Sequence, residues 1–232
     1  MCGRYSIVID EAKLRAQFTR DLTLPPDGVP TNYNVAPTQR GLVITNDRPD
    51  EVAQFRWGLV PFWAKDLKIG ARMINARSEG IESKPSFRKP IRERRCLVVA
   101  DSFYEWQRRG GKKQPFRIKP ADDRLLVMAG IWEQWTPKDG DPAPVFTYSV
   151  ITGAPNAEMQ PLHDRMPMLL LDADQQATWL ANDTPLPQVL ELLQTPPDGT
   201  LDYYPVSPLV GNVRNNGAEL HQPFTPPEGA EA

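Results

Sequence analysis

The sequence has few of the residues that form disulfides and metal sites. Its 232 residues include only two cysteines, Cys2 and Cys96, and two histidines, His163 and His221. These cannot build a disulfide framework and match no zinc spacing, so we expect no metal site and no cofactor. No apolar run approaches the roughly 18 residues of a membrane span, and the first residues lack the apolar stretch of a secretory signal. We therefore expect no membrane contact and a cytoplasmic location.

Charge is unevenly distributed along the chain. The formal net charge is −2, yet residues 56–119 contain 17 Lys and Arg against 6 Asp and Glu, a local balance of +11. A basic block suits a polyanion such as nucleic acid, because each neutralised phosphate releases a counterion. Many such blocks are only solvated surface, so charge alone leaves both interpretations open.

Short apolar runs separated by turns predict an α+β fold. We expect strands at residues 41–45, 52–60, 95–106, 115–120, 125–135 and 144–152. Helices are expected after the N-caps Asp10 and Asp172 and within residues 185–194, while 25 prolines argue against long helices. The sequence has no repeat or internal linker. We expect one domain over residues 1–222, built on a curved, mainly antiparallel, barrel-like sheet, followed by a disordered tail over 223–232.

Cys2 follows the initiator methionine directly, in a region where chains usually fray. Removal of Met1, which a small second residue favours, would leave an α-amine and a thiol on the same residue. Such an aminothiol attacks an aldehyde with its amine and then closes through sulfur to a thiazolidine ring. The alternative is a small buried apolar residue in an ordered terminus, which is common for free cysteines.

Three further stretches carry polar groups in apolar settings. Glu105 lies between two aromatic residues at the end of a strand-like run, and His163 precedes an apolar strand. Asn75 and Arg77 share one face if their segment is extended. Taken singly, they are better explained as an exposed strand residue, a structural histidine and a turn former. Together with Cys2 they supply a nucleophile, acid and base groups and an anion ligand.

Seven motifs in this order resemble the SOS response-associated peptidase (SRAP) family: MCGR, YNVAPTQ, WGLVPFWAKD, INARSE, RRCLVVADSFYEW, LHDRMP and VGNVRNNGAEL. They run from Cys2 to about Gln222, nearly the whole chain. The resemblance implies a DNA-damage protein that forms a covalent thiazolidine with the ring-opened aldehyde of an abasic site in single-stranded DNA, shielding the lesion from strand cleavage. The insert AKDLKIGAR before INARSE departs from the family pattern.

The resemblance also implies roles for individual residues. Cys2 supplies both nucleophiles, Asn75 lies at the open sugar, Glu105 deprotonates the α-amine, and His163 moves a proton in ring opening and crosslink reversal. Cys96 is expected to be an inert core thiol.

Five residues are implied as DNA contacts. Arg4 and Arg77 would hold phosphates beside the lesion, and Pro37 and Trp106 would wedge the strand at a junction with duplex. Trp63 would stack a base, with core packing as an almost equal alternative.

Two other function classes fit parts of the sequence. An N-terminal-nucleophile glutamine amidotransferase also begins Met-Cys-Gly, but no second synthase domain is visible and the basic block does not suit it. A non-covalent single-strand binder would need the basic and aromatic residues and not Cys2. The family name implies an enzyme of autoproteolytic-peptidase or lyase-like class, with the peptidase step limited to removal of residue 1 or a short propeptide. We expect a monomer associated with the nucleoid through DNA.

Overall fold

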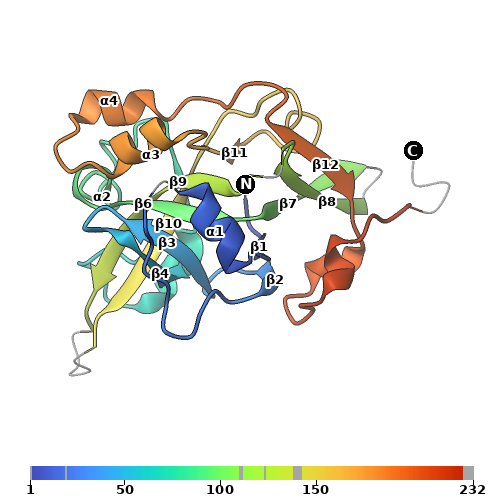
Figure 1. The fold of residues 1–232 in the computed structure, drawn as a ribbon, viewed down its shortest axis with the longest axis horizontal. Coiled ribbons are helices and arrows are strands. Elements are labelled where there is room, and N and C mark those ends of the chain that lie inside the picture. Colours follow the sequence, from blue (N-terminus) through green and yellow to red (C-terminus); the bar gives the residue numbers. More distant parts are fainter. Residues whose placement is uncertain (1, 19, 110–111, 123, 138–142, 227–232) are drawn as a thin grey trace.

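Five strands close into a barrel at the centre of the computed structural model (Figure 1). The structure describes residues 2–18, 20–109, 112–122, 124–137 and 143–226. Around the barrel the order is β10–β4–β3–β6–β9, and β9 pairs again with β10. Only the β4–β10 pair is parallel. The strands are β3 (Arg40–Thr45), β4 (Arg48–Trp57), β6 (Arg95–Ala100), β9 (Leu126–Trp135) and β10 (Val145–Gly153).

A second, antiparallel sheet lies beside the barrel, to its right in Figure 1. Its order is β12 (Leu201–Pro205), β8 (Lys112–Pro120), β7 (Ser102–Arg109), β1 (Tyr5–Ile7) and β2 (Asn32–Val35). The predicted fold class, α+β with a curved, mainly antiparallel and barrel-like sheet, is confirmed.

One predicted strand is wrong in extent. Residues 95–106 do not form a single strand but two, β6 in the barrel and β7 in the second sheet. Asp101 lies between them, and its carboxylate accepts hydrogen bonds from the backbone N–H of Val8 at 2.7 Å and from Arg117 Nη2 at 2.8 Å. These hydrogen bonds fix the point at which the chain passes from the barrel to the second sheet. The apolar residues on either side of Asp101 do not predict this change of sheet.

The predicted strand at 52–60 also ends early, at Trp57, because of Gly58. Gly58 has φ +117°, and a Cβ there would collide with the carbonyl of Gly70 in the 3₁₀-helix η1 (Leu67–Arg72). The insert AKDLKIGAR therefore packs against the chain leaving β4. Beyond it, β5 (Asn75–Arg77) runs parallel to β10, and β11 (Met166–Pro167) pairs with the end of the same strand.

The predicted helices are present and short. Asp10 caps α1 (Glu11–Gln17) through the N–H of Lys13, and Asp172 caps α3 (Ala173–Leu180) through the N–H of Gln175. The other helices are α2 (Pro90–Glu93), α4 (Leu186–Glu191) and the 3₁₀-helices η2 (Pro208–Gly211) and η3 (Ala218–His221). Within the described residues no helix has the length and apolarity needed to cross a membrane.

The predicted tail begins beside β12. Pro223 bridges Val206, and the N–H of Phe224 donates to the carbonyl of Pro205 at 2.9 Å. Residues 227–232 lie outside the described residues, so the boundary at 222 stays a prediction.

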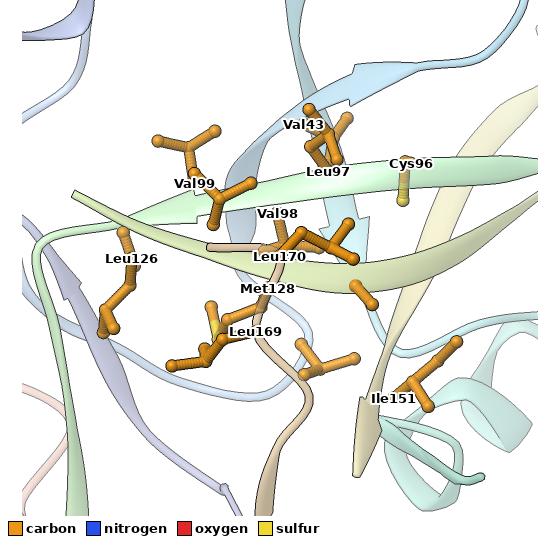
Figure 2. Close-up of a cluster of buried hydrophobic side chains, with 14 of the residues drawn as sticks. Val43, Cys96, Leu97, Val98, Val99, Leu126, Met128, Ile151, Leu169 and Leu170 are labelled. Atoms are coloured by element: carbon orange, nitrogen blue, oxygen red, sulfur yellow. The ribbon is translucent and has the colours of Figure 1, made fainter. Parts of the chain in front are cut away.

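Four of the barrel strands, β3, β6, β9 and β10, are buried on both faces over most of their length, which explains their nearly continuous apolar runs, whereas only Val52 and Trp57 of β4 are buried. All six residues of β6 are buried, and the segment that contains Leu169 and Leu170 pairs with β9 through a backbone bridge at Leu169 (Figure 2). Cys96 points into this apolar cluster, and burial raises the pKa of its thiol well above the ordinary value. The structure therefore supports the expectation of an inert core thiol.

Arg95 is a buried cation at the start of β6. Its guanidinium donates to the carbonyls of Trp179 and Ala181 at the C-terminal end of α3, both at 2.6 Å, and to Ile91 and Arg92 at 3.2 and 2.6 Å. No carboxylate pairs with it in the described part of the chain. Arg95 thus joins α2 and α3 to the barrel, because it donates hydrogen bonds to backbone carbonyls that have no donor within their own helix.

We predict that Arg95→Met lowers the free energy of unfolding by about 3 kcal/mol, because four buried carbonyls lose their donor. Urea unfolding followed by circular dichroism measures the change. The control is Arg92→Ala, whose side chain is exposed on α2 and which should change stability by less than about 0.5 kcal/mol. Equal stability of the two variants would contradict this role of Arg95.

Candidate active site

The start of the chain is built into the fold. β1 pairs with β7 at Tyr5–Phe103 and with β2 at Tyr5–Val35. The hydroxyls of Tyr5 and Tyr148 share a hydrogen bond inside the barrel, and position 41 must be glycine because a Cβ there would collide with both hydroxyls. Cys2, three residues before Tyr5, is consequently held in place and fully buried.

Cys2 is held by a polar partner from β5. Asn75 Nδ2 donates to the carbonyl of Cys2 at 2.7 Å, while Asn75 Oδ1 is buried without a hydrogen-bond partner in the described residues. Burial raises the pKa of the Cys2 thiol well above its ordinary value, and the negative charge of Glu105 raises it further. The thiol is therefore protonated at neutral pH, and the residue that holds the Cys2 carbonyl carries a buried acceptor with no partner in the described residues.

Glu105 is buried on β7, opposite Phe116 of β8. Because side chains alternate along a strand, its neighbours Tyr104 and Trp106 lie on the other face, where they pack against Val206 and Val210. Glu105 thus faces the Cys2 side of the sheet, and the second sheet brings it close enough to act on the thiol electrostatically.

His163 lies on a turn that contacts β7 and leads into β11, which pairs with β10. The N–H of Arg165 donates to His163 Nδ1 at 3.1 Å, and Asp164 Oδ1 lies 2.7 Å from the same nitrogen. Gln107 of β7 donates to the carbonyl of Pro161 at 2.9 Å. Just beyond the turn, β11 pairs with β10 at Thr152, the residue that β5 also meets at Arg77. The His163 turn and β5 therefore lie at the same end of β10.

The two predicted phosphate ligands differ in environment. Arg77 is exposed at the end of β5, as expected for an extended segment whose Ala76 is buried. Arg4 is half-buried, and its Nη1 donates to Asn34 Oδ1 at 2.7 Å and to the carbonyl of Val210 at 2.9 Å. Burial lowers the pKa of Arg4. Arg4 thus joins β1 to η2 and leaves only part of its guanidinium for a ligand.

The aromatic candidates also differ. Trp106 is half-buried, with the guanidinium of Arg4 5.9 Å from its ring centre. Trp63 is 47 % exposed, which excludes the core-packing alternative, and its neighbour Phe62 is 57 % exposed. Lys89 Nζ lies 5.5 Å from the Phe62 ring. Neither Phe62 nor Lys89 was predicted as a site residue, although Phe62 directly precedes Trp63 and Lys89 belongs to the basic block.

Pro37 is half-buried in the turn after β2 and precedes a strained residue. Thr38 has φ +74°, a conformation that costs a β-branched residue about 1–3 kcal/mol. Its N–H donates to Trp57 at 2.9 Å, and its carbonyl accepts from Arg56 at 2.8 Å. The surrounding fold imposes this turn, and no sequence signal reveals it.

The basic block divides into surface and interior. Arg94, Arg95 and Arg117 make internal bonds, Arg94 to Glu133 at 3.0 Å and Arg117 to Asp101 at 2.8 Å. The exposed members are Lys65, Lys68, Arg72, Arg77, Arg88, Lys89, Arg92, Arg108 and Lys113. Only part of the +11 balance is therefore available to a polyanion.

Comparison with known proteins gives consistent matches. A family model described as SOS response associated peptidase (SRAP) matches residues 1–213. The abasic site processing protein YoqW of Bacillus subtilis is 43 % identical over 95 % of this chain and 98 % of its own length. The abasic site processing protein HMCES of Gallus gallus is 33 % identical over 97 % of this chain and 78 % of its own length.

A solved structure supports the fold as well. The crystal structure of a protein from Bacteroides thetaiotaomicron aligns with a TM-score of 0.82 at 27 % identity, covering 97 % of this chain and 100 % of that one. The similarity extends over barrel and second sheet together.

Proposed function

The chain belongs to the SOS response associated peptidase family, and from that premise we propose that it processes abasic sites in single-stranded DNA. The names of YoqW and HMCES, both abasic site processing proteins, support this substrate. The observation that carries the proposal is the burial of Cys2 beside Asn75 and Glu105, because it places a thiol, an amide and a carboxylate together in a buried position.

The proposed product is a thiazolidine formed by Cys2 after Met1 has been removed. The α-amine bonds to C1′ of the ring-opened sugar, and water leaves to give an imine. Sulfur then bonds to the same carbon, the C=N electron pair moves to nitrogen, and the thiol proton ends on that nitrogen. One water is released and no oxidant is required. Closing the ring removes the imine that β-elimination needs, so the strand stays intact.

The raised thiol pKa supports this order of steps. A protonated, buried thiol is a poor first nucleophile, whereas the amine, with an ordinary pKa of about 7.7–8.0, is partly neutral at physiological pH. We assign Glu105 to deprotonating the amine. Asn75 would hold the Cys2 backbone with its amide nitrogen and accept from the open sugar with its free oxygen.

His163 is the proposed proton carrier for sugar opening and for reversal. Its Nδ1 has a partner in either protonation state, because it accepts from the Arg165 N–H when neutral and faces the Asp164 carboxylate when protonated. A side chain that can both give and take a proton suits both steps.

The DNA path is proposed from exposed charge and aromatic surface. Arg77 and Arg4 would bind phosphates, and Trp63 would stack a base, a contact worth about 1–3 kcal/mol. The strained turn at Pro37, together with Trp106, would mark a junction with duplex. We propose a monomer that meets DNA in the cytoplasm.

The two other classes are less well supported. A thiol with a raised pKa does not favour the direct cysteine attack of an amidotransferase. A purely non-covalent binder gives no reason for the ordered, buried Cys2. The peptidase step of the family name would be removal of residue 1.

We predict that purified protein lacks Met1 and forms a heat-stable adduct with single-stranded DNA carrying one abasic site. Cys2→Ala, or blocked Met1 removal, should abolish the adduct, because ring closure needs both nucleophiles. Intact mass and denaturing gels measure it. The matched control is Cys96→Ala, which removes the other thiol and should crosslink normally. A protein with retained Met1 that crosslinks at the normal rate and yield would exclude the chemistry.

Arg77→Ala should weaken binding of intact single strands of any sequence. The slope of log affinity against log salt should become shallower by about 0.7, the increment for one lost phosphate contact on a single strand. Fluorescence anisotropy at several salt concentrations measures it. Arg48→Ala is the control, since that arginine is exposed at the far end of β4. If the two variants have the same slope, Arg77 is not a phosphate ligand.

His163→Ala should slow crosslink formation modestly, because abasic sugars also open unaided. It should slow release from a preformed adduct by about 10²-fold or more, since reversal needs a proton at the departing sulfur or nitrogen. The assay chases preformed adduct with excess unlabelled abasic DNA between about pH 5.5 and 8. Equal release rates for wild type and variant would assign His163 a purely structural role.

A further inference from the structure

A bidentate ion pair connects the segment that follows β5 and the His163 turn. Arg165 Nη1 lies 3.0 Å from Glu79 Oε1, and Arg165 Nη2 lies 2.8 Å from Glu79 Oε2. The Arg165 side chain is 12 % exposed and that of Glu79 60 % exposed. Most surface ion pairs contribute little, but paired parallel bonds to a guanidinium fix geometry as well as charge. The pair therefore restricts the position of Arg165.

Arg165 also binds the strand between the two elements. Its Nη2 donates to the carbonyl of Thr152, its Nε lies 3.4 Å from Thr152 Oγ1, and Thr152 is the β10 partner of Arg77. On the other side, Lys84 Nζ donates to the Glu79 carbonyl at 2.8 Å. Glu79 is thus held from both sides, two residues after Arg77.

The backbone of Arg165 reaches the imidazole directly. Its N–H donates to His163 Nδ1 at 3.1 Å, which in the neutral ring favours the proton on Nε2, whereas the Asp164 carboxylate, 2.7 Å from the same nitrogen and 87 % exposed, favours the proton on Nδ1. A shift of the Arg165 backbone would weaken this hydrogen bond, and the proton of the neutral His163 ring would then no longer be held on Nε2. The position of one carboxylate is therefore coupled to the proton-carrying atom of His163.

We propose that Glu79 is a positioning residue, which holds Arg165 so that the Arg165 amide fixes the ring orientation and Nε2–H tautomer of His163 relative to β5. The part of the proposal that concerns crosslink reversal rests on the proposed function. The Arg165 hydrogen bonds also lower the pKa of Glu79, so the carboxylate is ionised across the neutral range.

Nitrogen-15 NMR of the histidine rings tests the positioning without DNA. With only two histidines, the spectrum is easily assigned. Burial, followed by the charge of Arg117, lowers the pKa of His221 to about 4, so its ring stays neutral between about pH 5.5 and 8 and serves as an internal reference. Wild type should show the Nε2–H tautomer of neutral His163. Glu79→Gln should add a substantial Nδ1–H fraction, leaving His221 unchanged.

Glu82→Gln is the matched control. It removes the same charge three residues away, from a side chain with no ion pair or hydrogen bond in the described residues, and it should leave both histidine spectra unchanged. Identical His163 spectra in wild type and Glu79→Gln would overturn the proposal. Equal changes in Glu79→Gln and Glu82→Gln would also overturn it, since a general charge effect would then be the cause.

Crosslink reversal gives the second measurement. Glu79→Gln should slow release from preformed adduct by about tenfold, the scale expected for a modest misplacement of a catalytic group. In a His163→Ala background the same change should have no further effect, because it acts only through that ring. Additive losses would overturn the proposal.

Binding of intact single strands should be the same in wild type and Glu79→Gln. Tighter binding in the variant would mean that Glu79 competes with phosphate for Arg165, and would also overturn the proposal. If wild type forms no adduct at all, the proposed function fails, while the NMR measurement still decides whether Glu79 positions His163.

Discussion

The insertion of β1 between β7 and β2 is the constraint on which the candidate site depends. Ordering a terminal residue costs about 1–2 kcal/mol of backbone entropy, and a chain end normally keeps that freedom. Here two ladders and the Tyr5–Tyr148 hydrogen bond offset the cost. Because Tyr5 is fixed, Cys2 can reach Asn75 with its carbonyl, and its thiol can be buried next to the charge of Glu105.

The sequence predicted the elements better than it predicted their partners. The caps Asp10 and Asp172 and the apolar runs located helices and strands, because these signals are local. The passage from β6 to β7 was missed, since apolar residues lie on both sides of it and the turn depends on the distant residues Val8 and Arg117. In the same way the basic block gave no sign that Arg95 is buried, because two of its four acceptors are carbonyls at the distant C-terminal end of α3.

The candidate site was found by motif and chemistry together. Residue type alone left Cys2, Asn75, Glu105 and His163 each with an ordinary explanation, and the resemblance to a family linked them. The structure adds features that residue type does not encode, namely the strain at Thr38, the aromatic surface at Phe62 and the pairing of Glu79 with Arg165. Each of these depends on backbone geometry or on a partner distant in the chain, so no local pattern predicts it.

β10 explains why these groups meet at one end of the barrel. It pairs with β9 and β4 along its first part, and with β5 and β11 along its last. The change from β4 to β5 occurs at Gly58, where the contact with Gly70 excludes any side chain and lets η1 fold back. The barrel therefore stays closed around its core along the first part of β10. The last part of β10 instead pairs with the short strands β5 and β11, beside the polar side chains of the candidate site. A longer β4 would fill the place of Asn75 and Arg77, so the early end of that strand is what makes room for the site.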